Sequence, residues 1–270
     1  GCFYVESPAM RMLLRKLRVE TYLALVAASS IIRPGVARSG MMREYILRTH
    51  DASRRTYIHP LMKELMEETF GIMVYQEDVI KVAHHFAGLS LSESDVLRRG
   101  MSGKFRSRDE FTKIKDRFFN NCNQRGYDEK ITSEVWRQIE SFAGYSFSKG
   151  HSASYAVESY QSLFLKAHYP LEFMVGVINN FGGFYRTEYY VHEARMAGAN
   201  IHAPCVNNSC YITGISGADI HLGFIHVDSL EQKVAMAIEH ERKTNGYFLS
   251  LENFLQRISI SKEQLRLLIR

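Results

Sequence analysis

Apolar residues recur three and four positions apart through most of residues 8–182, and this spacing is typical of one face of an α-helix. The segments with this pattern are 10–17, 61–66, 74–86, 111–119, 131–142 and 173–177. Ser92 to Asp95 supplies capping residues and an acidic first turn for a further short helix, and Pro170 suits the first turn of another. We therefore expect a mainly helical fold in which these apolar stripes form the core.

The pattern changes after Gly182, where residues 183–200 still look helical but residues 201–224 do not. Two short segments there, Cys210–Thr213 and Ile220–Leu222, resemble β-strands and lie close to glycines. They predict a small mixed α/β segment late in the chain.

Helices are expected again from about Ser229 to Arg242 and, after a turn at Asn245-Gly246, onward to the end. With a boundary placed near 195–205, we predict one domain over residues 1–204 and a second over residues 205–270. The chain begins at Gly1 without signal-peptide features, and it ends inside an apolar helical pattern. We therefore expect it to be a piece of a longer protein.

The composition excludes disordered and membrane-embedded classes, with 46% hydrophobic and 23% charged residues in a chain of 270. The most apolar stretch, Leu23–Ile32, is shorter than the roughly 20 residues that a bilayer requires. Four cysteines without a CxxC pair indicate a reducing compartment. We therefore expect a cytoplasmic protein without a membrane partner.

Basic charge is concentrated in one segment. The whole chain has 34 Lys and Arg against 29 Asp and Glu, a net charge of +5. The segment Arg98–Arg117 alone has eight basic and three acidic residues, and its net charge of +5 equals that of the whole chain. Clustered basic charge favours a polyanionic partner, nucleic acid or phosphate, although a solvated basic helix face would give the same pattern.

A stretch at Ser146–Tyr155 leads into a predicted helix whose start carries Lys149, His151 and Ser152. A helix N-terminus offers unpaired N–H groups and a positive dipole end to an anion, and Lys149 would add a charge. The stretch matches neither a Walker A loop nor a Rossmann fingerprint. The alternative is an ordinary helix start, capped by Ser148 or Ser152, that binds no ligand.

A second basic motif, Leu97–Lys104, places Arg98 and Arg99 before two glycines and a lysine. Arginine binds phosphate oxygens through two parallel N–H groups, and glycine lets a backbone approach closely. The alternative is a helix end whose arginines complement its own dipole. Arg33, before the turn residues Pro34-Gly35, faces either solvent or a ligand.

The other chemical signatures searched for are missing from the sequence. The histidines and cysteines between residues 192 and 226 lack the paired spacing of zinc modules, so we expect no metal site. This set is His192, His202, Cys205, Cys210, His221 and His226. We find no nucleophile elbow, and no pair of aspartates in a short apolar strand, the arrangement that would hold two divalent ions.

Taken together, six segments resemble motifs of the bacterial C-family DNA polymerases, the α subunit of DNA polymerase III. The resemblances are residues 1–7 to GxFQxES, 33–41 to RPGPxxSGM, 71–79 to GIxxYQEQV, 97–101 to LRRAM, 142–155 to FAGYGFNKSHSAAY and 165–173 to LKAHYPAEF. Their order and spacing cover residues 1 to about 205.

The resemblance implies a helical fingers domain, preceded by a palm and followed by the truncated start of a tandem helix-hairpin-helix domain. In such a polymerase the palm holds the Mg²⁺ ions, so this chain alone is expected to bind none and not to extend a primer. The implied partners are primer–template DNA and a dNTP. A sliding clamp and other replication subunits would bind the full-length protein.

The same resemblance implies roles for individual residues. Arg98, Arg99, Lys149 and Ser152 would contact the β,γ-phosphates, and His151 would lie near the sugar and exclude a ribose 2′-hydroxyl. Further nucleotide or DNA contacts would come from Arg33, Lys104, Arg106, Arg108 and Lys113.

The sequence departs from the family pattern at Tyr4, Val36, Gly100 and Gly150, where glutamine, proline, alanine and serine are usual. Leu222–Leu230 lacks the usual glycine pair of a helix-hairpin-helix turn. The resemblance therefore gives no expectation that this hairpin binds duplex DNA.

Asn179–Tyr185 resembles the GFY segment of an error-prone branch of the family. The chain is thus either an error-prone paralogue or the main replicative copy. The alternative function is a helical module that binds nucleic acid or a sliding clamp without nucleotide chemistry.

Overall fold

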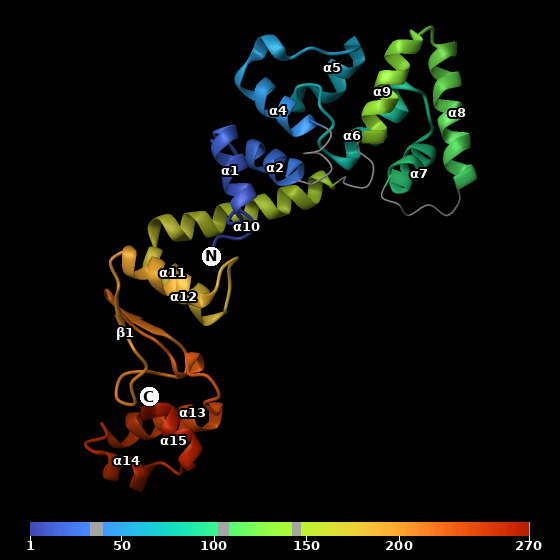
Figure 1. Ribbon diagram of the computed structural model, residues 1–270. Helices are drawn as coiled ribbons and strands as arrows, with labels where there is room; N and C mark the ends of the chain where they lie inside the picture. Colours follow the sequence, from blue (N-terminus) through green and yellow to red (C-terminus); the bar gives the residue numbers. More distant parts are fainter. Residues whose placement is uncertain (33–39, 102–107, 142–146, 270) are drawn as a thin grey trace. The chain divides into compact units, whose positions relative to one another are not determined.

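The computed structural model describes residues 1–32, 40–101, 108–141 and 147–269, and it divides the chain into two compact units (Figure 1). The first unit contains residues 7–160, and the second contains residues 161–270 together with residues 1–6. The described part of the chain is mainly helical with a small sheet, which confirms the predicted fold class. The junction between the units lies inside a helix at 160/161, whereas the predicted domain division at 204/205 stays a prediction.

In the described residues, the first unit consists mainly of helices. Its helices are α1 (Pro8–Leu17), α2 (Tyr22–Ile31), α4 (Met41–His50), η1 (Ala52–Arg54), α5 (Pro60–Met66), η2 (Glu67–Thr69), α6 (Gln76–Lys81), η3 (Val82–Phe86), α7 (Leu91–Met101), α8 (Arg108–Gln124), α9 (Glu129–Ser141) and the first part of α10 (Lys149–His168). The helical stripes predicted at 10–17, 61–66 and 111–119 are confirmed, and so is the described part, 131–141, of the stripe predicted at 131–142. Phe142, the last residue of the fourth stripe, lies outside the described residues.

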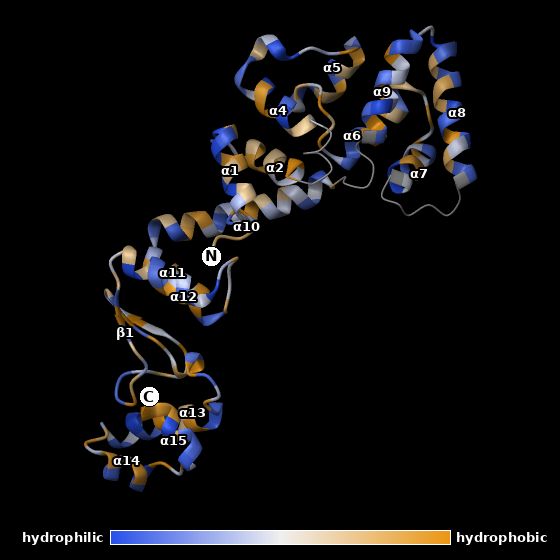
Figure 2. Cartoon of the chain, viewed as in Figure 1, coloured by the Kyte–Doolittle hydropathy of each residue, from blue (hydrophilic) through white to orange (hydrophobic). Residues whose placement is uncertain are grey.

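An aromatic core joins η3, α8 and α9 in this unit. Phe86 and Phe118 are fully buried, and the Phe118 ring lies 5.1 Å from the Trp136 ring, measured between centroids. Tyr127 stacks on Phe86 at 4.6 Å. Both α8 and α9 carry hydrophilic and hydrophobic residues along their length (Figure 2), as expected of helices with one buried face. The interpretation of the apolar stripes as core is therefore correct.

The segment predicted as one helix over 74–86 is divided in the structure. Val74 and Tyr75 are extended, α6 starts at Gln76, and the five-residue π-helix η3 follows α6. The buried Asp78 carboxylate accounts for this start, because its Oδ2 accepts the N–H groups of Val74 at 2.8 Å and Tyr75 at 2.9 Å. The prediction that Val74 belongs to the helix is therefore wrong.

Helix α7 begins at Leu91, ahead of the capping residues predicted at Ser92–Asp95. The cap is Ser90, whose Oγ accepts the Glu93 N–H at 3.2 Å while the Glu93 carboxylate accepts the Ser90 N–H at 2.8 Å. This reciprocal pair is a capping box. It fixes the start of the helix that carries Arg98 and Arg99.

The second unit combines helices with a small sheet. It contains the rest of α10, then α11 (Pro170–Asn179), α12 (Thr187–Met196), β1 (Asn200–His202), β2 (Gly214–Ser216), β3 (Asp219–His221), η4 (Phe224–His226), α13 (Gln232–Asn245), α14 (Leu251–Arg257) and α15 (Lys262–Ile269). The strand order is β1-β3-β2, with β1 parallel to β3 and β2 antiparallel to it. Ile220 of β3 is fully buried and pairs with Ile201 on one side and Ile215 on the other.

The strand predictions were partly wrong. The segment Ile220–Leu222 overlaps β3, but Cys210–Thr213 is not a strand, and β2 starts at Gly214 instead. The backbone of Tyr211 and Thr213 bonds to side chains, since Glu239 accepts the Tyr211 N–H at 2.8 Å and Asn179 accepts the Thr213 N–H at 2.7 Å. Side chains distant in sequence thus accept the backbone N–H groups that a neighbouring strand would bind in a sheet.

Two apolar clusters stabilise the second unit. One contains residues of α11, α12 and the sheet, including Ile178, Tyr190 and Ile220. The other contains residues of η4 and of the three C-terminal helices, including Phe224 and Ile238. Within the described ranges, no helix is long and apolar enough to span a bilayer.

Candidate functional site

The start of α10 is joined to the start of α6. The Glu77 carboxylate accepts the Ser148 hydroxyl and the Lys149 N–H, each at 2.9 Å. The Gln76 N–H donates to the Phe147 carbonyl oxygen at 3.1 Å. These three bonds attach α10 to α6 across about 70 residues of sequence. The sequence prediction of a helix whose start carries Lys149, His151 and Ser152 is confirmed.

Lys149 presents its ammonium group at the surface of the first unit. Its Nζ lies 2.7 Å from the Glu68 carboxylate and 5.3 Å from the centre of the Tyr75 ring. About a third of the Lys149 side chain is exposed, and more of Glu68. An ion pair this exposed contributes only about 0–1 kcal/mol, so a multiply charged anion can displace the carboxylate.

Arg98 and Arg99 end α7 and share one carboxylate. Asp95 accepts from Arg98 Nη2 at 2.8 Å and lies 3.0 Å from Arg99 Nε. Arg98 also donates from Nη1 to Gln76 Oε1 at 2.9 Å. Two cations facing one anion leave a net positive charge at the end of this helix. The Gln76 contact brings Arg98 to the same start of α6 that holds α10.

His151 and Ser152 lie in the first turn of α10 but differ in exposure. His151 is exposed, and its ring meets Phe147 edge-on at 5.4 Å and lies 5.7 Å from Tyr155. The Ser152 side chain has no exposed surface, and its hydroxyl bonds to that of Ser30 on α2. In this structure Ser152 packs α10 against α2 and does not offer its hydroxyl to a ligand.

The N-terminus of α10 retains donors that a ligand can use. The Lys149 N–H is taken by Glu77, and the Ser152 N–H donates to the Ser148 carbonyl oxygen. Within the described ranges, the N–H groups of Gly150 and His151 have no hydrogen-bond partner. Free N–H groups and the helix dipole favour an anion at this position.

The other predicted contacts are only partly described. Arg33, Lys104 and Arg106 lie outside the described residues, as does the Arg108 side chain. Lys113 is exposed on α8 and forms no hydrogen bond or ion pair with the residues described above. Two neighbouring cations of this basic segment are paired, Lys115 with Glu140 at 3.4 Å and Arg117 with Glu93. Pairing reduces the free positive charge that the sequence suggested for α8.

Sequence reasoning missed the residues that assemble this site. Gln76 and Glu77 belong to the segment that resembles GIxxYQEQV, and Glu68 lies just before it. Glu68 and Glu77 lie in an acidic run, residues 63–78, whose negative charge offsets part of the positive charge of the chain. Periodicity could not identify these residues, because their partners Arg98 and Lys149 lie 22 and 81 residues further along the chain.

Asp78 has an unusual protonation equilibrium beside this site. Burial raises the pKa of the Asp78 carboxyl to about 6, against the lowering effect of the Tyr75 and Val74 N–H groups. Burial also raises the pKa of the neighbouring Tyr75 hydroxyl far above its ordinary value. Both side chains are buried beside the start of α6.

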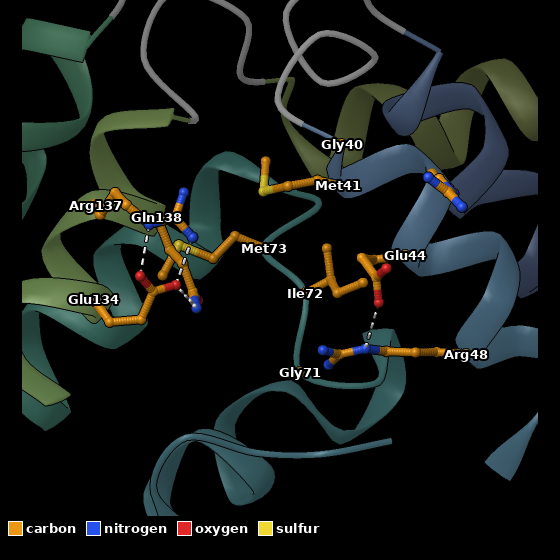
Figure 3. Close-up of a pocket in the computed structure, with 11 residues that line it drawn as sticks. Gly40, Met41, Glu44, Arg48, Gly71, Ile72, Met73, Glu134, Arg137 and Gln138 are labelled. Atoms are coloured by element: carbon orange, nitrogen blue, oxygen red, sulfur yellow. Dashed lines mark hydrogen bonds and ion pairs between the residues drawn. The ribbon is translucent and has the colours of Figure 1, made fainter. Parts of the chain in front are cut away.

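A pocket of about 350 Å³ lies elsewhere in the first unit, between α4, residues 71–73 and α9 (Figure 3). Arg137 binds Glu134 through Nε at 2.6 Å, and Arg48 lies 3.8 Å from Glu44. Arg48 also donates to the carbonyl oxygens of Phe70 and Thr56 at 2.8 and 3.0 Å. Of the predicted site residues that the structure describes, none lines this pocket, and its labelled arginines are engaged by neighbouring groups.

In the second unit, a hairpin at Val227–Glu231 joins η4 to α13. Ser229 has a φ of +62°, a left-handed conformation that glycine adopts more easily. Gln264 of α15 fixes the hairpin, donating to the Ser229 carbonyl oxygen at 3.0 Å and accepting the Glu231 N–H at 2.7 Å. Asp228 and Glu231 are exposed and acidic, and Glu231 pairs with the exposed Lys233 at 2.7 Å.

Several histidines and cysteines of the second unit contact neighbouring side chains. His202 stacks on His221 at 4.5 Å and lies 2.9 Å from Asp219. His226 bonds to the Thr213 hydroxyl at 3.0 Å, and Arg242 donates to the Cys210 sulfur at 3.8 Å. The described residues include no group of three or more His, Cys, Asp or Glu that could hold a metal ion.

Comparison with known proteins gives two family matches. Residues 1–126 match the bacterial DNA polymerase III alpha subunit finger domain, and residues 198–270 match a helix-hairpin-helix motif. A DNA polymerase III subunit alpha of Borreliella burgdorferi is 33% identical over 257 residues, covering 95% of this chain and 22% of its own length. One of Staphylococcus aureus is 33% identical over 259 residues, covering 96% of this chain and 24% of its own length.

The chain therefore spans about a quarter of the length of the curated relatives that it matches. The finger-domain match includes α6 and α7, and the similarity to both relatives extends over nearly the whole chain. The hairpin at Val227–Glu231 lies inside the second match. The chain carries the finger domain of the bacterial DNA polymerase III alpha subunit family, followed by a helix-hairpin-helix region.

Proposed function

We propose that this chain is the dNTP-binding part of a DNA-directed DNA polymerase, with Arg98, Arg99, Lys149 and the N-terminus of α10 binding the triphosphate. The observation that carries the proposal is that α6 joins Arg98 and the start of α10, although they are 51 residues apart. Guanidinium and ammonium groups beside free N–H groups suit the β- and γ-phosphates.

The proposed role in DNA synthesis is to position the triphosphate and stabilise its charge. When a primer 3′-hydroxyl attacks the α-phosphate, pyrophosphate leaves and its negative charge increases. Cations placed in advance stabilise that charge without reorganisation. The exposed ring of His151 would lie beside the sugar, and Ser152 would support α10 through Ser30. A direct contact of Ser152 with phosphate stays a prediction.

The proposed reaction requires Mg²⁺ in the complete polymerase. The described residues do not form a metal site, as noted above. We propose that the carboxylates that bind Mg²⁺ lie in another part of the complete polymerase. The residues of this chain would bind and orient the phosphates.

Primer–template DNA is the proposed macromolecular partner. The exposed Lys113, with the basic residues predicted nearby at 104–108, would contact the phosphate backbone. A sliding clamp and other replication subunits are proposed partners of the complete protein. A cytoplasmic location follows from the same proposal. An error-prone role remains an expectation from the segment 179–185.

The kinetic test replaces the two cations in the complete polymerase that carries this segment. We expect Lys149→Ala and Arg98→Ala each to raise the KM for dNTP or lower kcat by at least about tenfold, or roughly 1.4 kcal/mol. Steady-state primer extension at varied dNTP concentration measures the effect. Lys130→Ala, an exposed lysine of α9 in the same unit, is the matched control.

Unchanged kinetics in folded Lys149→Ala and Arg98→Ala proteins would contradict the triphosphate assignment. The remaining candidate would then be a nucleic-acid-binding module. The helix-hairpin-helix match favours that candidate. It predicts salt-dependent DNA binding together with a melting temperature that dNTP does not change.

A further inference from the structure

Arg98 and Lys149 share no direct contact in the described part of the chain. Arg98 bonds to Asp95 and Gln76, whereas Lys149 contacts Glu68, Glu77 and Tyr75. Phosphate binding by two cations on separate helices requires that their separation be held to within a fraction of an ångström. Some residue between the helices must therefore fix their positions.

Gln76 forms hydrogen bonds both to Arg98 of α7 and to the chain just before α10. Its side-chain Oε1 accepts from Arg98 Nη1 at 2.9 Å, and its own N–H donates to the Phe147 carbonyl oxygen at 3.1 Å. Phe147 is two residues before Lys149. A single residue thus connects the guanidinium of α7 with the chain that enters α10.

The backbone of Gln76 is itself held in place. The adjacent Glu77 bonds to Ser148 and Lys149, and Asp78, two residues along, bonds to the extended residues Val74 and Tyr75. The three consecutive side chains therefore face three different partners. Gln76 is the one that reaches an arginine.

The chemistry of this side chain matters as well as its position. An amide oxygen accepts a hydrogen bond from a guanidinium but leaves the positive charge intact. A carboxylate at the same place would neutralise Arg98 and repel a phosphate. Asp95 already shares its charge between Arg98 and Arg99, so a neutral second partner preserves the net positive charge.

We propose that Gln76 is a positioning residue for the nucleotide phosphates, holding Arg98 toward the start of α10 without neutralising it. The proposal rests on the proposed function, since it assumes that Arg98 binds phosphate. Gln76 itself touches no phosphate in this proposal. It acts through Arg98, and that dependence can be measured.

The experiment is a double-mutant cycle in the complete polymerase, with the KM for dNTP and inhibition by inorganic pyrophosphate as readouts. Gln76→Met keeps the length of the side chain but removes the acceptor, and Arg98→Met removes the cation. We expect Gln76→Met to raise the KM for dNTP and the inhibition constant for pyrophosphate by about fivefold or more, with kcat changed less than twofold. On the Arg98→Met background, Gln76→Met should cause no further change.

If the double variant raised the KM by the product of the two single-variant factors, the proposal would be overturned, because Gln76 would then act independently of Arg98. An unchanged KM in Gln76→Met beside a raised KM in Arg98→Met would also overturn it. An unchanged KM in Arg98→Met alone would overturn the phosphate role of Arg98 itself, and this single variant separates the two failures. Gln124→Met, an exposed residue at the end of α8, controls for the substitution.

Gln76→Glu separates positioning from simple structural support. This variant keeps the bond to Arg98, so a purely structural role predicts normal KM. We expect the KM for dNTP to rise about fivefold or more, because the new carboxylate neutralises Arg98. A KM equal to or below that of the parent would overturn the proposal. Gln76→Glu also serves as the test should Gln76→Met fail to fold.

Discussion

Asp78 shows how one buried carboxylate sets the position of a helix start. It is 3% exposed, and one of its oxygens accepts two backbone N–H groups. Burial favours the protonated form, and the two bonds favour the ionised form. Burial prevails, and the pKa rises to about 6. The same residue fixes Val74 and Tyr75, which directly precede Gln76 and Glu77, so its protonation state bears on the candidate site.

The raised pKa of Asp78 predicts a pH dependence of stability. Since the folded-state pKa lies above the unfolded value of 3.8, the protonated group stabilises the fold. That contribution is complete below about pH 4 and is lost as the pH rises through about 6. Asp78→Asn keeps an acceptor without the charge. We expect its stability relative to the parent to increase from pH 4 to pH 6 and then level off, by at most about 3 kcal/mol.

Urea unfolding of the chain at pH 4, 5, 6 and 7, followed by circular dichroism, measures this difference. Asp116→Asn, at an exposed position of α8, is the control. A difference between parent and Asp78→Asn that stays constant over this range would contradict the assignment. The sequence showed Asp78 only as part of an acidic run. Its burial depends on packing that no local pattern reveals.

Among the elements, long amphipathic helices could be predicted and short segments could not. The stripes of α8 and α9 repeat over three or more turns, so periodicity identifies them. The start of α6 depends on Asp78, and the segment Cys210–Thr213 depends on Glu239 and Asn179. A strand of three residues such as β1 is too short for alternation to be recognised.

The C-terminal helices also depend on one distant side chain. Arg257 of α14 is 15% exposed, and its guanidinium lies 4.3 Å over the Phe248 ring. The guanidinium donates to two side-chain oxygens, Glu241 Oε1 at 3.0 Å and Asn253 Oδ1 at 3.2 Å. It also donates to three backbone carbonyl oxygens, those of Glu241 at 3.2 Å, Gly246 at 2.8 Å and Tyr247 at 3.1 Å. This one guanidinium ties the end of α13, the following turn and α14 together.

We therefore expect Arg257→Met to destabilise the second unit by about 2–4 kcal/mol, because it removes a donor from several carbonyl oxygens and breaks the ion pair with Glu241. Arg257→Lys should recover only part of this loss, since an ammonium lacks the planar fork. Thermal unfolding measures both. Arg186→Met, whose side chain is 89% exposed, should change stability by less than about 0.5 kcal/mol. Equal effects at the two positions would contradict this role for Arg257.

At the scale of the whole molecule, motif order identified the family, and the comparisons agree with it. The resemblance also named Arg98 and Lys149, which the structure connects through α6. It named Ser152 as well, but the partner of that hydroxyl is Ser30, 122 residues earlier. Contacts over such separations depend on tertiary packing, which one sequence without its structure does not reveal.

The chain covers only part of the length of its relatives, and this predicts that it lacks polymerase activity by itself. Since it spans 22–24% of their length, we expect the purified chain not to extend a primer–template with dNTP and Mg²⁺. Gel-based primer extension with a complete polymerase as positive control tests this. Nucleotide incorporation by the pure chain would contradict our proposal that the carboxylates for Mg²⁺ lie elsewhere.

The carboxylates of Glu68 and Asp95 have a consequence for ligand choice. They act as internal counter-ions of Lys149 and of the two arginines, so an incoming phosphate must exchange with them. A ligand with one phosphate group gains little from such an exchange, whereas a triphosphate or pyrophosphate brings enough charge to replace both carboxylates together. On the proposed function, the site therefore selects ligands by their number of negative charges. We therefore expect a nucleoside monophosphate to bind more weakly than the corresponding triphosphate.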